Sequence, residues 1–517
     1  ILPGDISLQV PPNLNSEYVS QLTLSGINDF GGISPVTKDY VNPEAPWPEI
    51  EKLNQIVLKT NQFLKPRATL YPKYFADLET FSTQEIASKL LQITDSQSLI
   101  RSDQWKSGVS NKIPSYPEAI LSSNIRSLIK DVETNPSAMN VQSLLETSEN
   151  DFQYIVKYAD EVKSQIHGPD ISFVVNRNIN YTNICSFKCN FCAFSKGKGH
   201  DDLRGKPYNI SEEEIIRRTK EAIDRGATEV CLQGGIHPKF SGETYLDIVR
   251  AIRSVSDSIH IHAFSPLEID HGRKTLNISV KDFLIELKNV GLNSLPGTAA
   301  EILHDDIRAI ICPDKLNSNE WVEIIKAAHS VGLPTTSTMM FGHVENMSHV
   351  AHHLIRLLEI QNSTNGLTEF VPLPFVAEEA PIFRRGKSRP GPTFKETILV
   401  HSVARILYNG SINNIQGSWV KMGLPGLKYL LSSGINDIGG VLMNESITRS
   451  AGASFGQELN LDDVLSIIDE LGLNLKQRNT LYHSLTNDIQ DLINLQSIPL
   501  IPIINEYHQP KKINTTV

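Results

Sequence analysis

Three cysteines lie within eight residues, in a pattern that favours a shared metal centre. Cys185, Cys189 and Cys192, in the stretch NYTNICSFKCNFCAF, have the spacing C-x3-C-x2-C. Thiolates are the usual ligands of iron–sulfur clusters, and three of them leave one iron of a four-iron cluster open for a substrate or cosubstrate. The alternative is a structural zinc with His200 as fourth ligand. Zinc sites commonly use two C-x2-C pairs, whereas this chain has one, so we predict a cluster.

The two remaining cysteines have no such neighbours. Cys231 and Cys312 are single and stand among apolar residues, which is typical of small core side chains rather than ligands. An odd, small number of cysteines also argues against a disulfide-stapled secreted protein.

Helix and strand patterns alternate beyond the apolar stretch ISFVV, residues 171–175. The helical stretch SEEEIIRRTKEAIDRG, for example, opens with Ser211 and Glu214 at capping-box spacing, closes on Gly226 and leads into the strand pattern ATEVCLQGG. Repeated helix–strand units indicate a parallel sheet with helical crossovers. With seven or so strands and no dinucleotide fingerprint, we predict an α/β fold of the TIM-type (β/α) barrel class. The cysteine motif follows its first strand.

The ends of the predicted strands carry polar residues. Barrel active sites lie at the carboxyl ends of the strands, so such residues are candidates for binding and catalysis. They are Gln233, His262, Ser265, Thr298, His343, Glu369 and Gln416. By contrast, His349, His352 and His353 lie on a predicted helix away from these ends, and we interpret them as a solvated or packed face, not a metal site.

One short turn occurs twice in the chain. SGINDFGG, residues 25–32, and SGINDIGG, residues 433–440, share seven of eight residues. Asn, Asp and Gly favour turns, but turn chemistry alone does not fix their order. We therefore interpret the pair as two copies of one module, the first cut short. A partial barrel leaves strand edges and apolar faces uncovered, so we expect the first copy not to fold on its own.

The repeat and the local composition divide the chain into four predicted parts. Residues 1–62 are the remnant of the first module, and 63–138 are a connector with local helices, rich in Ser, Gln, Asn and Lys. Residues 139–485 form the intact barrel, and 486–517 form a C-terminal tail.

Charge and hydropathy limit the partners. The 517 residues carry a net charge of −10, which gives no reason to expect nucleic acid as a partner. No apolar run approaches the roughly 18 residues that span a bilayer, so we expect no membrane segment. We predict a cytoplasmic protein. The chain begins at Ile1 instead of Met, so we expect residues missing ahead of it, an organelle-targeting peptide being one possibility.

The cysteine motif, with Phe191 before its last cysteine, resembles that of the radical S-adenosylmethionine (radical SAM) enzymes. The resemblance implies a 4Fe–4S cluster on Cys185, Cys189 and Cys192, with S-adenosylmethionine chelated at the open iron. It also implies a reductant or electron-transfer protein, because one electron must cleave the sulfonium to yield a 5′-deoxyadenosyl radical. LQGG, residues 232–235, resembles the glycine pair that meets the methionine amino group. The cofactor-binding residues implied are Phe191, Gln233, Gly234 and Gly235.

Further motifs are similar to the tyrosine-using half of the deazaflavin (FO) synthases, over about residues 139–485. They are CLQGGIHP, HAFSPLEI, SLPGTAAEIL, PTTSTMMFGHVE, TEFVPLPF, RPGPT, NIQGSWVKMG and GINDIGGVLMNESI. The resemblance implies hydrogen abstraction from L-tyrosine and cleavage of its Cα–Cβ bond. The 4-hydroxybenzyl fragment then joins C5 of 5-amino-6-(D-ribitylamino)uracil, and 2-iminoacetate is released.

The N-terminal copy resembles the closing segment of the lyase half of fused FO synthases. It has no cysteine motif of its own, so the resemblance implies that this chain lacks the lyase step and has a complete lyase half as its partner. The nearest alternative is an aminofutalosine-synthase-type enzyme of menaquinone synthesis, against which TEFVPLPF and the N-terminal copy argue. A zinc-binding, non-catalytic barrel is the alternative from a different class.

Both substrates carry many polar groups, so the resemblance implies polar residues at the barrel mouth. The predicted catalytic residues are His262, Glu268, His343 and Glu369; further candidates are Ser265, Thr338, Gln416, Asn436 and Asp437. For each of them, an ordinary loop residue or a hydrogen-bonded polar group of the barrel is the competing interpretation.

Overall fold

The protein is built around a closed ring of parallel strands. The computed structural model describes residues 6–34, 36–60, 62–116, 118, 122, 124–196 and 206–503. The strands of the ring are β1 (Asp170–Val174), which runs on into β2 (Asn176–Asn180), then β3 (Glu229–Gln233), β4 (His260–Ala263), β5 (Thr335–Phe341), β6 (Leu367–Pro374) and β7 (Asp437–Gly440). Single parallel bridges at Ser294 and Leu295, and at Ile415 and Gln416, fill two further positions. Counting β1 and β2 as one strand, the described residues give eight positions.

The ring closes between its last and first strands. β7 pairs in parallel with β1, with Asp437 opposite Ser172. β8 (Asn474–Gln477) pairs with β1 on the side away from β7. The predicted (β/α) barrel is confirmed. The sequence predicts about seven strands, whereas the described residues form a closed ring of eight positions.

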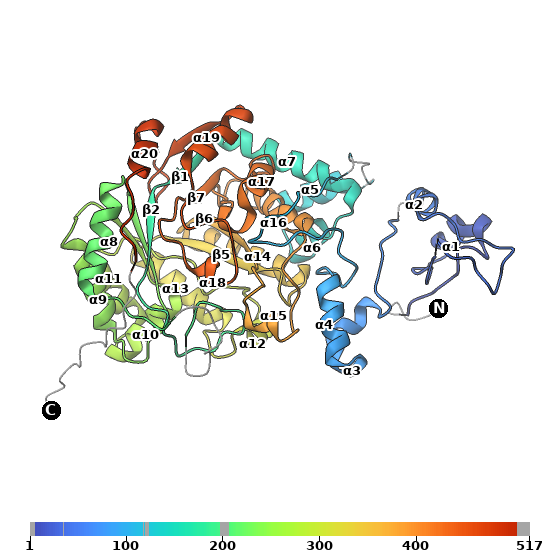
Figure 1. Ribbon diagram of the computed structural model, residues 1–517, viewed down its shortest axis with the longest axis horizontal. Helices are drawn as coiled ribbons and strands as arrows, with labels where there is room; N and C mark the ends of the chain where they lie inside the picture. The colour runs from blue at the N-terminus through green and yellow to red at the C-terminus, as the bar shows by residue number, and fades with distance from the viewer. Residues whose placement is uncertain are drawn as a thin grey trace.

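Helices cross between the strands and cover the outside of the ring (Figure 1). They include α8 (Glu212–Asp224), α9 (Gly242–Arg253), α10 (Pro266–Leu276), α11 (Val280–Asn289), α12 (Asp305–Ile311), α13 (Ser318–Ser330), α14 (Met347–Thr364), α16 (Phe394–Leu407) and α17 (Trp419–Leu431). In α8, the Ser211 side chain accepts from the Glu214 amide at the predicted cap, while Ile215 and Ala222 face the core. An N-cap with a periodic apolar stripe is thus enough to begin and orient this helix.

The second half of the connector belongs to the barrel body. Ile125, Ile129 and Val132 of α5 (Ile125–Thr134) are buried in the same apolar cluster as the strands. α6 (Ala138–Leu145) and α7 (Glu149–His167) continue this cluster, and α7 packs along α16. The connector is therefore not a loose linker over this stretch. None of the helices in the described ranges is long and apolar enough to cross a membrane.

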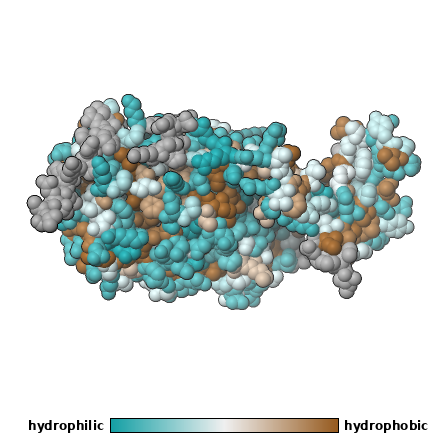
Figure 2. Space-filling view, turned by 90° about the horizontal axis from the view of Figure 1, so that it is seen from below, coloured by the Kyte–Doolittle hydropathy of each residue, from teal (hydrophilic) through white to brown (hydrophobic). Residues whose placement is uncertain are grey.

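The N-terminal residues form a separate small unit. Figure 1 shows α1 (Val19–Leu24) and α2 (Ile50–Leu58) to one side of the barrel, beyond α3 (Leu78–Phe81) and α4 (Gln84–Ile93), and Figure 2 shows the same projection from below. Asn54 of α2 lines a cavity that it shares with the barrel body. Val19, Leu53 and Val57 make up its own apolar core. That this unit does not fold on its own stays a prediction.

Candidate active site

The cysteine loop follows β2 and packs on the loop that follows β3. The Ser186 amide donates to the Ile236 carbonyl at 2.8 Å, and the Gly235 amide donates to the Thr182 carbonyl at 2.9 Å. The Ile236 amide also points at the Cys185 sulfur, 3.3 Å away. Two loops from neighbouring strands thus form one unit at the carboxyl end of the barrel, where barrel enzymes carry their active sites.

The three thiols of this loop interact electrostatically. Burial raises the pKa of Cys189 and of Cys192; Cys192 raises that of Cys189 further, and Cys185 that of Cys192. The Lys315 ammonium acts in the opposite direction on both. Burial thus disfavours the thiolate form of Cys189 and Cys192 in the apoprotein, and a bound cationic centre would be needed to deprotonate them.

The thiols are not arranged around a single ion. In the part of the chain that the structure describes, no three His, Cys, Asp or Glu side chains converge as ligands of one metal. The thiolates of a cubane cluster bind three different irons, so convergence on one point is not required of them. His200, the predicted zinc ligand of the alternative, lies outside the described residues.

A partly buried lysine lies against the cysteine loop. Lys315 Nζ lies 2.9 Å from Glu301 Oε1 and 5.1 Å from the centre of the Phe191 ring. The Asn190 side chain donates to the Ile310 carbonyl at 2.7 Å, which ties the loop to the end of α12. Neither Lys315 nor Glu301 could be predicted from the sequence, because nothing in their local pattern links them to the cysteines.

The predicted glycine pair fills a space in which no side chain fits. A Cβ on Gly234 would lie 2.3 Å from the Tyr181 ring. A Cβ on Gly235 would lie 2.3 Å from the Ile184 carbonyl oxygen and 3.0 Å from Cys185 Cβ. Real Cβ atoms do not approach other atoms so closely, so glycine is required for the two loops to touch. The preceding Gln233 places its amide 3.9 Å from the Cys231 sulfur.

Glu268 anchors the turn beside the glycine pair. It closes the capping box of α10, accepting from the Ser265 amide at 2.7 Å and the Ser265 hydroxyl at 2.5 Å. Its other oxygen accepts from the Tyr181 hydroxyl, and burial raises the pKa of the Glu268 carboxyl. These contacts support a positioning role for Glu268, through Tyr181, on Gly234.

Two predicted residues lie inside the barrel. His262 on β4 places Nδ1 2.7 Å from the Ser294 hydroxyl, and burial lowers the His262 pKa against the opposing effect of Glu229. The Thr338 hydroxyl on β5 donates to the Gly297 carbonyl at 2.8 Å. A neutral imidazole at this position can donate or accept one proton, and its catalytic role remains a prediction.

His343 is enclosed by protein partners. Its Nδ1 lies 2.8 Å from Glu345 Oε2 and its Nε2 lies 3.1 Å from the Met340 carbonyl oxygen. Arg389 pairs with Glu345 at 3.0 Å, and the net effect of His343 and Arg389 is to lower the Glu345 pKa despite its burial. His343 is fully buried, so the geometry supports a role in fixing the turn after β5 more than contact with substrate.

Glu369 and Asp437 lie at the opposite end of the barrel from the cysteines. Glu369 is the third residue of β6 and Asp437 the first of β7, so the expectation that they end their strands is wrong. Arg478 holds Asp437 at 2.6 and 2.9 Å and lies 3.4 Å from Glu369, which accepts from the Tyr482 hydroxyl. Burial raises the Glu369 pKa to about 7. Gln416 and Asn436 border this network, which closes the barrel floor.

Most residues predicted to be uninvolved lie in other surroundings, but Cys312 lies close enough to the cysteine loop to raise the pKa of Cys189. Cys312 is buried in the apolar core, and Cys231 lies half-buried on β3. On α14, His353 is fully buried and Nδ1 accepts from the Leu303 amide at 3.0 Å, whereas His349 stacks edge-on against His304. These contacts fit the predicted interpretation of the α14 histidines as a packed face.

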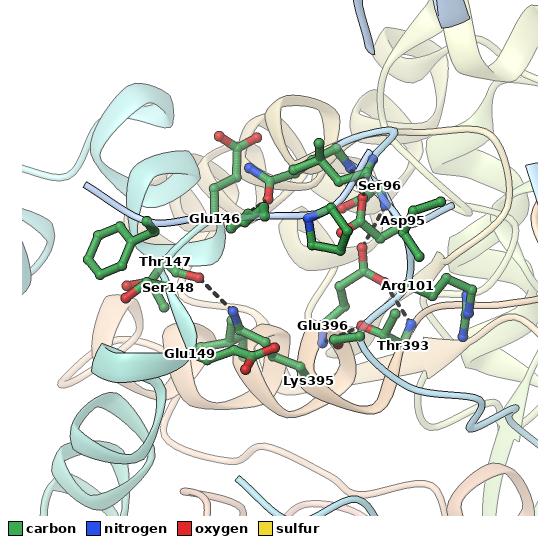
Figure 3. Close-up of a pocket in the computed structure, with 18 of the residues that line it drawn as sticks. Asp95, Ser96, Arg101, Glu146, Thr147, Ser148, Glu149, Thr393, Lys395 and Glu396 are labelled. Carbon is green, nitrogen blue, oxygen red and sulfur yellow. Dashed lines mark hydrogen bonds between the residues drawn. The ribbon is translucent and has the colours of Figure 1, made fainter. Parts of the chain in front are cut away.

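A cavity of about 370 Å³ lies outside the barrel. Figure 3 shows its walls: Asp95, Ser96 and Arg101 of the connector, the α6–α7 turn around Thr147, and the start of α16 at Lys395 and Glu396. Glu396 accepts from the Ser96 amide at 2.8 Å, and Lys395 donates to the Thr147 carbonyl at 2.7 Å. None of the predicted site residues lines this cavity, so it is distinct from the candidate active site.

Replacing Asp95 by Asn should stabilise the protein above neutral pH. Burial and the nearby Glu396 raise the Asp95 pKa from 3.8 to about 6. The folded state therefore holds this proton more tightly, and wild-type stability falls as pH rises through about 6. Asn keeps the acceptor for the Gln97 and Leu99 amides without the charge. We expect a gain of about 1–2 kcal/mol at pH 8, measured by urea unfolding.

The gain should disappear below about pH 4, where Asp95 is protonated in both states. Asp306→Asn is the matched control, because that side chain is 89% exposed. A gain of equal size at pH 4 and pH 8 would contradict the assigned cause.

Family models match most of the barrel. The Radical SAM superfamily model matches residues 179–357, and the CofH/MqnC C-terminal region model matches residues 364–490. Among solved structures, the FeFe-hydrogenase maturase HydG from Carboxydothermus hydrogenoformans has a TM-score of 0.52 at 14% identity, covering 69% of this chain and 80% of its own. Methylornithine synthase (PylB) has a TM-score of 0.52 at 17% identity, covering 71% and 99%. These likenesses show the shared fold.

Curated relatives give a narrower assignment. The FO synthase of Nocardia farcinica is 37% identical over 541 residues, covering 93% of this chain and 62% of the relative; that of Mycobacterium leprae is 36% identical, covering 93% and 61%. This chain thus spans about three fifths of their length. The 5-amino-6-(D-ribitylamino)uracil–L-tyrosine 4-hydroxyphenyl transferase of Methanopyrus kandleri is 46% identical over 328 residues, covering 63% of this chain and 88% of the relative. The chain therefore belongs to the radical SAM superfamily and, within it, to the family of the FO synthases and this transferase.

Proposed function

We propose that this chain transfers the 4-hydroxybenzyl group of L-tyrosine to 5-amino-6-(D-ribitylamino)uracil, a step in the formation of the deazaflavin chromophore FO. One observation carries the proposal. The cysteine loop after β2 packs directly on the glycine pair after β3, within the region that matches the transferase of Methanopyrus kandleri.

Membership of the superfamily implies a 4Fe–4S cluster and S-adenosylmethionine, and the residues present fit both. Cys185, Cys189 and Cys192 supply three thiols on one loop, and the Gly234–Gly235 backbone is bare where a Cβ would collide with that loop. When bound, the cluster and S-adenosylmethionine supply the radical that removes hydrogen from tyrosine. We propose that the three cysteines hold the cluster and that the glycine pair, with Gln233 and Phe191, lies against S-adenosylmethionine.

The remaining residues of the proposal position and enclose the reactants. Tyr181 and Glu268 fix the glycine loop, while Lys315 and Glu301 fix the cysteine loop. His262, neutral because burial lowers its pKa, is the barrel residue that we propose to bind a polar group of substrate. Rigid support of this kind keeps a reactive radical close to a single target atom.

The proposal extends to partners. The reaction needs an external one-electron reductant, and closure of the deazaflavin ring needs a lyase step for which this chain offers no second cysteine motif. We therefore propose a complete lyase half as the functional partner. A cytoplasmic location and the lack of a nucleic-acid partner stay predictions.

Product analysis with labelled tyrosine tests the function. Protein reconstituted anaerobically with iron and sulfide is incubated with S-adenosylmethionine, reductant, the diaminouracil and tyrosine carrying carbon-13 in either the ring or the carboxyl group. We expect ring label in a uracil adduct and carboxyl label only in the small released fragment, followed by mass spectrometry. We expect no fluorescent FO until a complete lyase half is added.

Other outcomes of this experiment would point to one of the alternative functions. Cleavage of S-adenosylmethionine without transfer of ring label would contradict the proposed acceptor and point to an aminofutalosine-synthase-type enzyme. A protein that takes up zinc, stays colourless after reconstitution and cleaves nothing would indicate the non-catalytic barrel. FO made by this chain unaided would contradict the absence of a lyase step.

A further inference from the structure

Lys421 follows the ring position at Gln416, next to β7, and lies in the first turn of α17. The backbone of this turn is held at two points. The Trp419 indole donates to the Gly440 carbonyl at 2.9 Å, and the Lys421 carbonyl accepts from the Gly108 amide at 2.7 Å. The Lys421 side chain is half-buried. The turn is therefore fixed at the carboxyl end of the barrel, where the cysteine and glycine loops also lie.

Two carboxylates from opposite sides of the ring act on the Lys421 ammonium. Glu445 lies in the loop after β7, whereas Glu301 follows the ring position at Leu295. Leu295 and β7 occupy the fourth and the eighth of the eight ring positions, so they face each other across the barrel. A side chain that interacts with both carboxylates therefore extends over the barrel mouth.

Both carboxylates already have other partners. Glu301 lies 2.9 Å from Lys315 Nζ, and Glu445 accepts from the Thr448 amide at 2.6 Å. No ion pair joins either of them to Lys421 in the part of the chain that the structure describes. Burial lowers the Lys421 pKa to about 8 against the opposite effect of both glutamates, so the side chain is a cation at neutral pH. A half-buried cation without a direct partner favours binding of an anion.

The backbone is strained in both loops that face Lys421. Glu301 has a φ of 49°, and Leu442 and Asn444, just before Glu445, have φ values of 57° and 67°. Residues other than glycine adopt this left-handed conformation at a cost, and they persist in it where the surrounding structure holds them, often at ligand-binding sites. The strain is thus concentrated around the Lys421 ammonium.

Apolar side chains lie between the Glu301 loop and the turn that carries Lys421. Met340 and Leu373 stand opposite each other near the ends of β5 and β6, and both are half-buried although their strand neighbours are buried. The Met340 amide donates to the Glu301 carbonyl at 2.9 Å, and β6 borders the ring position that Lys421 follows. An apolar surface beside a single cation suits an aromatic amino acid, whose ring and carboxylate need different surroundings.

We propose that the Lys421 ammonium binds the carboxylate of L-tyrosine, while Met340 and Leu373 lie against its ring. The inference rests on the proposed function, in which tyrosine is the substrate. The diaminouracil has no carboxylate, and family resemblance assigns the carboxylate of S-adenosylmethionine to the open iron of the cluster. Tyrosine is therefore the reactant whose anionic group needs a cation from the protein.

Binding of tyrosine and of tyramine, which lacks the carboxylate, tests the assignment. Each is titrated by calorimetry into reconstituted protein with S-adenosylmethionine but no reductant, so no turnover occurs. We expect the parent to bind tyrosine at least about tenfold more tightly than tyramine. Lys421→Met should weaken tyrosine binding by at least about tenfold and leave tyramine binding within about threefold. Lys421→Arg keeps the charge and should retain part of the preference for tyrosine.

Lys428→Met is the matched control, because this lysine lies at the other end of α17 and pairs with Glu470 near the surface. It should bind both ligands as the parent does. Circular dichroism shows whether each variant folds, and Lys421→Gln replaces Lys421→Met if the latter does not.

Three results would count against the inference. Equal tyrosine affinity in the parent and Lys421→Met would overturn it while leaving the proposed function intact. Loss of S-adenosylmethionine binding with unchanged tyrosine binding would assign Lys421 to the cosubstrate instead. A parent protein that binds no tyrosine would overturn the proposed function, and this inference with it.

Discussion

Replacing any one of Cys185, Cys189 and Cys192 by Ala should abolish formation of 5′-deoxyadenosine. The three thiols share one loop at the carboxyl end of the barrel and influence one another's ionisation. Removing one leaves a cubane with two protein ligands, too few to hold it with a site-differentiated iron. We expect a loss of at least about 1000-fold, of the size seen when a catalytic centre is removed. Product is quantified by chromatography after anaerobic reconstitution.

Cys231→Ala and Cys312→Ala are the matched controls. Both residues are free thiols in the barrel region, and neither lies on the loop; Cys312 is the closer control, because its core side chain raises the pKa of Cys189. They should retain the iron content and most of the product of the parent protein, with at most a modest loss of stability from the smaller side chain. Full cleavage of S-adenosylmethionine by Cys189→Ala would exclude the assigned ligand set.

The cysteine and glycine loops could be predicted because each follows a strand signal directly. ISFVV and ATEVCLQGG are short apolar runs bounded by polar residues, and in a parallel barrel the loops after neighbouring strands must meet. Their contact, through Thr182 and Gly235, follows from topology alone. Lys315 and Tyr181 could not be predicted in the same way, since their contacts depend on how side chains pack between distant segments.

The position of Glu369 shows where the strand pattern is ambiguous. TEFVPLPF is apolar nearly throughout, and β6 extends through Pro374, so the pattern does not reveal that Glu369 stands near the strand's beginning. A residue at the start of a parallel strand faces the barrel floor, not the mouth. The partners that mark this floor, Arg478 and Tyr482, come from more than a hundred residues later in the chain.

The ring strand that the sequence patterns do not predict is β7. The predicted strand patterns include the stretches around Ser294 and Gln416, where the structure has only single bridges. β7 (Asp437–Gly440) lies in the repeated sequence SGINDIGG, whose Asn, Asp and Gly residues favour turns and are depleted in strands. Its pairing with β1 and with Gln416 comes from closure of the ring, not from local propensity.

Replacing Gly235 by Ala should lower 5′-deoxyadenosine formation by about 100-fold, because a displacement near 1 Å at a reacting centre costs about that much. The added Cβ would lie 2.3 Å from the Ile184 carbonyl oxygen and 3.0 Å from Cys185 Cβ. The first contact is with backbone, which no rotamer change can relieve, so the cysteine loop must move away from the glycine loop. We expect weaker binding of S-adenosylmethionine by calorimetry and an altered electron paramagnetic resonance signal of the reduced cluster.

Gly32→Ala provides the control for the substitution itself. A Cβ at Gly32 would meet nothing within 4 Å, and that residue has no positive φ, so the change should leave product formation and the cluster spectrum as they are. Gly234→Ala should fall between the two, since its closest contact is the Tyr181 ring, a side chain held by Glu268. Normal turnover by Gly235→Ala would mean that the two loops separate in the working enzyme, and the contact between Gly235 and the cysteine loop would then have no part in holding S-adenosylmethionine.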